Sequence, residues 1–126
     1  MRARIMRAAA RPTNKAAASN FTGLVLHEEV FAPEAPSRLR ASRVCFTPGG
    51  RTNWHTHAVG QVLYVLNGVG RYQTQGEAVQ VLLPGDTVVI PPGVKHKLWN
   101  PGGEPLVLLC CCSPAYSHED TVLLES

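Results

Sequence analysis

Long hydrophobic runs are missing from this sequence of 126 residues. Its longest uninterrupted apolar stretch, Leu106 to Cys112, is much shorter than the roughly 20 residues that a membrane-spanning helix needs. From Phe21 onward, no window of ten or more residues has apolar positions at helical spacing. We therefore expect neither a membrane-spanning segment nor a helical fold.

Acidic residues are absent from the first 15 positions, which hold five of the twelve basic residues. The rest of the chain has seven basic residues against nine acidic ones, so its formal charge is negative. Nucleic-acid binding requires a basic surplus, commonly with Arg or Lys clusters interleaved with aromatic residues, and neither feature occurs after residue 20. We expect no nucleic-acid partner.

Cysteine is scarce, and its spacing excludes the common cysteine-based scaffolds. Three of the four cysteines are consecutive, from Cys110 to Cys112, and the fourth is Cys45. This pattern matches neither a disulfide framework nor a CxxC metal site. It indicates reduced thiols in a cytoplasmic protein.

Turn residues, by contrast, are abundant, with 11 glycines and 10 prolines between short runs of Val, Leu, Ile and Tyr. The runs predict strands at 22–27, 38–46, 52–57, 61–66, 70–74, 78–83, 87–90, 96–100 and 105–112. Closely spaced short strands are typical of an all-β sandwich or a closed jelly-roll barrel, which leaves few exposed edges. We divide the chain into a basic tail (1–20), a barrel (21–113) and a C-terminal tail (114–126).

Two segments carry residues suited to metal binding. His55 and His57 are two positions apart in an extended stretch, so alternation along a strand points both to one face, and Gln61 shares their parity. His96 follows a Pro-Gly turn. Three imidazoles and a carboxamide oxygen suit Mn, Fe, Co, Ni, Cu or Zn and leave open positions for water or substrate. We predict one divalent ion held by these four residues.

The same residues lie within two longer motifs of the cupin superfamily. The first, G(X)5HXH(X)3-4E(X)6G, is matched by Gly49, His55, His57 and Gly68, with Gln61 where glutamate is usual. The second, G(X)5PXG(X)2H(X)3N, is matched by Gly85, Pro91, Gly93, His96 and Asn100. The chain resembles a single-domain small cupin, which implies an all-β double-stranded β-helix, or jelly-roll barrel, around a small-molecule site. Small cupins usually pair, so we also expect a homodimer, with the N-terminal tail crossing to the partner.

A narrower resemblance concerns the metal. Residues 51–57, followed by Gly60 and Gln61, are similar to the bacterial cupins related to manganese-dependent hydroxynitrile lyases, whose metal shell is also three His and one Gln. The resemblance puts manganese first among the candidate ions. That group carries two further histidines, proposed to handle the substrate or its proton, where this chain has Leu98 and Leu108. Cyanohydrin cleavage by that mechanism is therefore not expected.

The neutral ligand shell favours a Lewis-acidic ion and non-redox chemistry, which puts a lyase or isomerase acting on a small organic molecule first. An Fe-dependent dioxygenase and a non-catalytic cupin that binds or senses a small ligand are the alternatives. The latter stays open because no other clear acid or base is expected inside the barrel. Residues expected to line the pocket are Ser42, Val44, Arg51, Leu98, Leu108, Cys110 and Cys112. Among these, Arg51 would either meet an anionic substrate or form a salt bridge beside a turn.

Overall fold

The computed structural model describes residues 3–31, 34, 36–37, 39–112 and 121–125, and of residues 112 and 121–125 only the backbone. Strands make up nearly all of its regular structure, apart from one short 3-10 helix, η1 (Ala8–Ala10). Among the described residues there is no helix with the length and apolar character needed to span a membrane. The predicted all-β class is confirmed.

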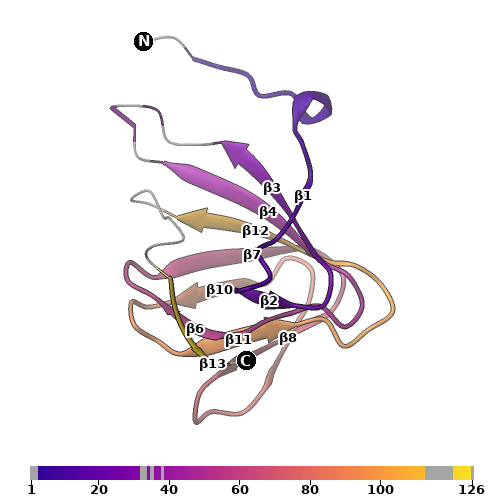
Figure 1. Cartoon of the computed structure of the whole chain (residues 1–126), viewed down its shortest axis with the longest axis vertical. Coiled ribbons are helices and arrows are strands. Elements are labelled where there is room, and N and C mark those ends of the chain that lie inside the picture. The colour runs from indigo at the N-terminus through magenta and orange to yellow at the C-terminus, as the bar shows by residue number, and fades with distance from the viewer. Residues whose placement is uncertain (1–2, 32–33, 35, 38, 113–120, 126) are drawn as a thin grey trace.

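The first of two antiparallel sheets has six strands in the order β1-β3-β4-β12-β7-β10 (Figure 1). In that order the strands span Asn14–Lys15, Val25–Phe31, Arg40–Phe46, Leu106–Cys112, Gln61–Asn67 and Thr87–Ile90. The long strands β4, β12 and β7 form its centre, with Val44 opposite Leu108 and Leu108 opposite Val65. This sheet provides one wall of the barrel.

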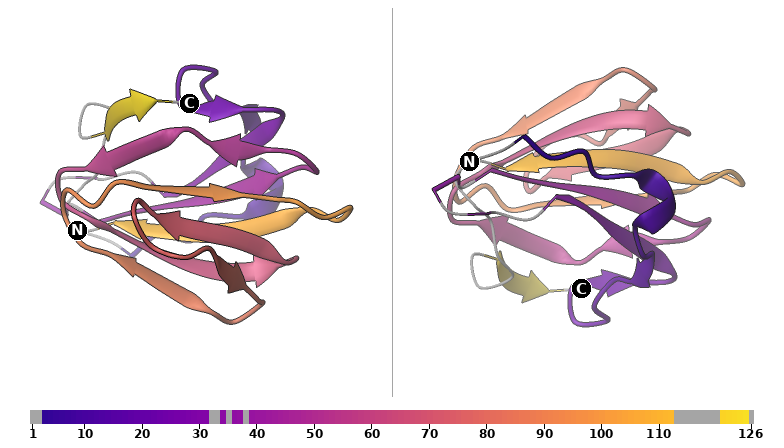
Figure 2. Two further views of the ribbon diagram at one scale, coloured as in Figure 1. Left: turned by 90° about the horizontal axis from the view of Figure 1, so that it is seen from below. Right: turned by 90° about the horizontal axis from the view of Figure 1, so that it is seen from above.

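The second sheet has seven strands and faces the first (Figure 2). Five follow the order β13-β6-β11-β5-β2 and span Thr121–Glu125, Trp54–His57, His96–Trp99, Arg51–Thr52 and Phe21–Thr22. The other two, β8 (Gly70–Thr74) and β9 (Gln80–Leu82), extend from β11. Two such layers with antiparallel pairing are the predicted jelly roll.

Apolar side chains from both sheets fill the space between the layers. Along β7, Leu63 and Val65 point inward and are buried, whereas Val62, Tyr64 and Leu66 alternate with them on the exposed face. This period of two is what a strand with one buried face requires. The core cluster consists of Val25, Phe46, Leu63, Val65, Leu82, Ile90, Leu98, Leu106, Leu108 and Cys110.

Two predicted strands have the observed bounds, and two others are each divided: the strand predicted at 52–57 consists of β5 and β6 with Asn53 between them. The strands at Gly70–Thr74 and Thr87–Ile90 have the predicted bounds. The predicted strand at 22–27 is instead two strands in different sheets, β2 and β3, separated around Gly23, whose φ is +78°. The second of them runs past the predicted end because it stays paired with β4 as far as Phe31, and the side chain of Glu28 also forms an ion pair with Arg11 at 2.7 Å.

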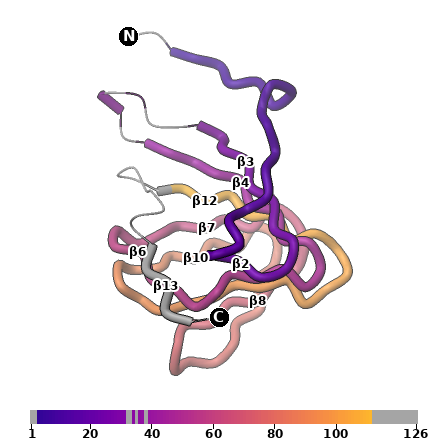
Figure 3. Tube along the Cα trace, viewed as in Figure 1, coloured from indigo at the N-terminus to yellow at the C-terminus, as the bar shows by residue number. Residues whose placement is uncertain are grey.

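Both segments expected as tails contribute strands. β1 lies within residues 1–20 and pairs with β3, and β13 lies within residues 114–126 and pairs with β6. The N-terminal segment runs from β1 in the first sheet to β2 in the second (Figure 3). The part of this segment that the structure places is therefore attached to its own chain.

Candidate metal centre

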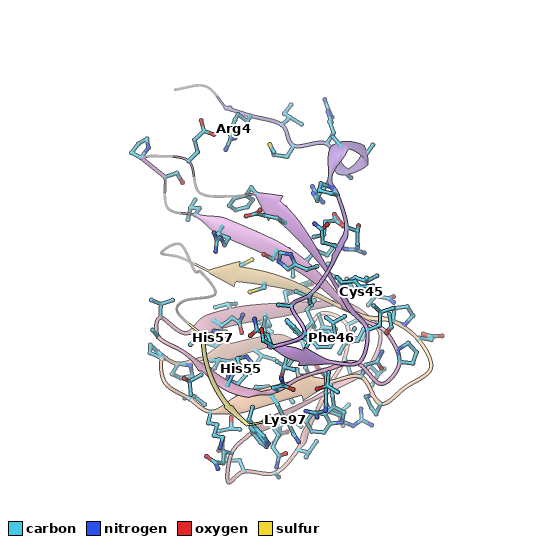
Figure 4. All side chains as sticks on the ribbon, viewed as in Figure 1. Arg4, Cys45, Phe46, His55, His57 and Lys97 are labelled. Atoms are coloured by element: carbon cyan, nitrogen blue, oxygen red, sulfur yellow. The ribbon has the colours of Figure 1, made fainter. Side chains whose placement is uncertain are left out.

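Three histidines from two neighbouring strands meet between the sheets. His55 and His57 lie two apart on β6, and His96 on β11 is the antiparallel partner of His55. Their exposed fractions are only 7%, 3% and 0%. One ring nitrogen from each lies within 4.8 Å of those of the other two. Figure 4 shows His55 and His57 together between the layers. The alternation argument thus brings the three imidazoles to one point.

Backbone carbonyls fix the orientation of two of the rings. Nδ1 of His55 lies 2.6 Å from the carbonyl oxygen of Asn53, and Nδ1 of His96 lies 2.8 Å from that of Val94. A carbonyl only accepts, so both Nδ1 atoms carry the proton and each Nε2 keeps its lone pair. The buried Nε2 of His96 has no hydrogen-bond partner. A metal ion fits this arrangement, because outer contacts of this kind orient histidine ligands.

Burial also sets the charge of the rings. Loss of hydration lowers the pKa of His55, and burial followed by repulsion from His55 lowers the pKa of His96 to about 4. Both rings are therefore neutral at pH 7, which is the form that binds metal. A metal ion could therefore bind at pH 7 without displacing protons from these two rings.

Gln61, the fourth predicted ligand, lines the same cavity as His55 and His57. Its amide Nε2 donates a hydrogen bond to Sγ of Cys110, 3.0 Å away. That contact occupies the nitrogen end of the carboxamide and leaves Oε1 as the atom suited to a divalent ion. Cys110 therefore acts on the orientation of a candidate ligand.

The cavity next to the histidines has a volume of about 320 Å³. Five of the residues predicted to line it do so: Ser42, Val44, Leu98, Leu108 and Cys110. Arg51 does not, because its guanidinium turns back to the carbonyl oxygen of Thr52. The side chain of Cys112 is outside the described residues. Leu98 and Leu108 are each 2% exposed, so this part of the wall is apolar.

Sequence reasoning missed three basic residues that line the cavity: Lys15 on β1, His27 on β3 and Arg40 on β4. The expectation that the barrel holds no further acid or base is wrong, because the imidazole of His27 lines the cavity. The alternation of side chains along a strand could have predicted that two of these three residues face the cavity. Arg40 shares the alternation of Ser42 and Val44, and His27 shares that of Val25. Both residues lie inside predicted strands, 22–27 and 38–46, so their alternation with cavity residues could be derived from the sequence.

The remaining motif residues hold the turns around the site. Asn100 is buried, and its amide nitrogen donates to the carbonyl oxygens of Phe46 and Glu104. Gly68 has a φ of +84°, and a Cβ there would lie 2.3 Å from the carbonyl oxygen of Pro105. Both residues act on the backbone and not on the ion.

Comparison with known proteins agrees with this geometry. The chain is 41% identical over 101 residues to an (R)-mandelonitrile lyase of Granulicella tundricola, covering 80% of this chain and 75% of that protein. It is 44% identical over 78 residues to an uncharacterized protein of Methanocaldococcus jannaschii, covering 61% and 62% of the two chains. A crystal structure of a cupin-like protein from Thermotoga maritima superposes with a TM-score of 0.78 at 34% identity, covering 89% and 84%.

A family match covers the centre of the chain. Residues 42–112, from β4 through β12, match the family described as the cupin domain. This segment contains all four predicted ligands and both sequence motifs. The two-layered fold, the three-histidine cluster and the family match lead to one conclusion: this chain belongs to the cupin domain family.

Proposed function

We propose that this chain is a manganese-dependent lyase that cleaves a small organic molecule in the cavity between the sheets. The observation that carries the proposal is the buried cluster of three histidines beside that cavity. The 41% identity to a mandelonitrile lyase favours lyase chemistry over the other reactions of a metal centre. We place the protein in the cytoplasm, where thiols such as Cys45 and Cys111 stay reduced.

His55, His57, His96 and Gln61 would hold the ion through Nε2 atoms and a carboxamide oxygen. All four ligands are neutral, so a bound divalent ion keeps its full charge and supplies a Lewis acid to the substrate. The Asn53 and Val94 carbonyls hold two of the imidazoles, and Cys110 holds the carboxamide. These contacts would keep the ligand atoms in place while substrate enters and product leaves.

His27 is the residue that we propose for proton transfer. It lines the cavity from β3, opposite Val44 in the strand register. Leu98 and Leu108, by contrast, cannot take or give a proton. Bond cleavage by a lyase requires a base or an acid, and imidazole titrates nearest neutral pH. The proton-handling group of this protein would thus stand on a different strand from those of the hydroxynitrile lyases, which argues for a different substrate.

The test is metal analysis joined to turnover. Mass spectrometry of the purified chain should find one manganese ion per chain, and the Mn-loaded protein should cleave a member of a panel of cyanohydrins and hydroxy acids. His57→Ala should lose both the metal and the activity. His27→Gln should keep the metal and lose roughly 100-fold or more in turnover, the usual contribution of a general acid or base.

Two results would contradict the proposal. Oxygen uptake by iron-loaded protein, with no turnover by the manganese form, would make the protein a dioxygenase. Tight binding of panel compounds with no turnover under either metal would make it a non-catalytic binding protein. Full activity of His27→Gln would remove that residue from proton transfer and leave the metal assignment in place.

A further inference from the structure

The cavity carries positive charge without acidic residues to balance it. Its described lining includes the cations of Lys15 and Arg40, and no Asp or Glu is among those lining residues. The predicted ligand set is neutral, so a bound divalent ion would add its charge to theirs. Charge next to apolar walls is costly unless it is paired. An anion in this cavity would offset that charge.

Arg40 is the residue whose own contacts point to that anion. Its Nε is buried and has no hydrogen-bond partner. Within the described part of the chain its guanidinium forms no ion pair or hydrogen bond. A buried donor left without a partner is rare in folded proteins, and a ligand in the cavity that accepts a hydrogen bond would satisfy this one.

The position of Arg40 connects it to the metal centre. It stands two residues before Ser42 on the same face of β4, and Ser42 is paired with Cys110 of β12. Cys110 in turn contacts Gln61. Two steps along a strand cover about 7 Å and neighbouring strands lie about 5 Å apart, and Arg40, Ser42, Cys110 and Gln61 all line the same cavity.

The outer face of the same sheet provides a contrast. Arg43 points away from the cavity, 45% of its side chain is exposed, and it lies 3.8 Å from Glu28. Glu28 also binds Arg11 at 2.7 Å. Glu29 is opposite Ser42 in the strand register and so lies on the same face of the sheet as Arg40, but it is exposed, does not line the cavity and forms no ion pair among the described residues. The outward arginines thus have carboxylate partners, whereas the inward one has none.

We infer that the substrate carries a carboxylate and that Arg40 binds it. A planar guanidinium donates two parallel hydrogen bonds to a carboxylate, which fixes position as well as charge. Leu63, Leu98 and Leu108 would contact the apolar remainder of the molecule. This inference rests on the proposed function only in that the bound carboxylate is taken as the substrate of the lyase.

The test compares two probes of equal shape and different charge, phenylacetate and phenylacetamide. Isothermal titration of both into the Mn-loaded and the metal-free protein measures the preference for the charged probe with and without the ion. The wild type should prefer phenylacetate in both forms. Arg40→Met should lose roughly tenfold to a hundredfold in phenylacetate affinity, the range expected for one charge-assisted contact, and Arg40→Lys should recover part of it. The matched control, Arg43→Met, should bind as the wild type does.

Equal binding of the two probes by the wild type would overturn the inference, and so would a preference that Arg40→Met leaves unchanged. Tighter binding of phenyl phosphate than of phenylacetate would overturn the assignment to a carboxylate. Failure of the proposed function would look different. If the chain prefers phenylacetate through Arg40 but turns over no compound, the carboxylate inference stands and the lyase proposal fails. If it cleaves a neutral cyanohydrin efficiently and shows no carboxylate preference, the lyase proposal stands and the carboxylate inference fails.

Discussion

The metal-free protein should lose stability steeply in mildly acidic solution because His96 is buried in its neutral form. In the unfolded chain this imidazole has its ordinary pKa of 6.5, whereas burial and the neighbouring His55 lower its folded-state pKa to about 4. Between these two values the unfolded chain binds a proton that the folded chain does not. Stability is therefore complete above pH 6.5, falls as the pH drops towards 4, and loses nothing more to this group below that point.

The size of the loss follows from the two pKa values. Each pKa unit between the folded and the unfolded state corresponds to about 1.4 kcal/mol, so His96 costs about 3 kcal/mol of unfolding free energy by pH 4. Desolvation also lowers the pKa of His55, so both histidines reduce the unfolding free energy as the pH falls. A loss of this size is a large part of the roughly 5–15 kcal/mol that stabilises a typical domain.

Urea unfolding of the metal-free protein from pH 7.5 to pH 4 measures this loss, and His96→Gln provides the comparison. The glutamine does not titrate, so the variant should lose about 3 kcal/mol less than the wild type across this range. Carboxylates titrate in both proteins and cancel in the difference. Equal pH dependence of the two proteins would refute the reasoning, because it would mean that His96 is protonated in the folded chain as readily as in the unfolded one.

The remaining predictions concern the site, the assembly and one turn. His57→Ala should abolish metal binding yet keep the β circular dichroism spectrum, and loss of the fold would make the ion structural. Leu98→His combined with Leu108→His should raise mandelonitrile cleavage above the wild-type level, and strong wild-type cleavage would refute the apolar-wall argument. Light scattering at micromolar concentration should give the mass of a homodimer, and a monomer mass would contradict this. Gly68→Ala should lower the melting temperature, because its Cβ would meet the Pro105 carbonyl at a φ of +84°; an unchanged melting temperature would count against that clash.

The fold could be predicted largely from local pattern. Alternation along residues such as Leu63 and Val65 and frequent turns are enough for an all-β class, and the glycine-rich motifs identified the jelly roll. Strand ends were harder, because a charged residue such as Glu28 reads as a loop unless its partner is known. Its partner, Arg11, is 17 residues away in sequence, and its pairing with Glu28 depends on the folded structure.

The cluster of three histidines was predictable for a geometric reason. The two-residue repeat of a strand is enough to point His55 and His57 to the same face. The antiparallel pairing of β6 with β11 is enough to bring His96 next to His55. Each histidine lies in one of the two cupin motifs, and the resemblance implies that the two motifs meet in the fold. Lys15, His27 and Arg40 have no such motif, since each comes from a different strand and they meet at one cavity only after the first sheet has formed.

This division between the two walls of the cavity bears on how the family varies. The ligands come from the second sheet and from Gln61, whereas Arg40 and His27 come from the first, so the two sets can change independently. A relative can therefore keep the ion and replace the residues that contact the substrate, and 41% identity to a mandelonitrile lyase is compatible with a different substrate. In this chain the cavity has two such features, the apolar side chains of Leu98 on the second sheet and Leu108 on the first, and the basic pair His27 and Arg40 on the first sheet. A substrate that suits both must present an apolar body to the leucines and an anionic group to Arg40, which a neutral cyanohydrin does not.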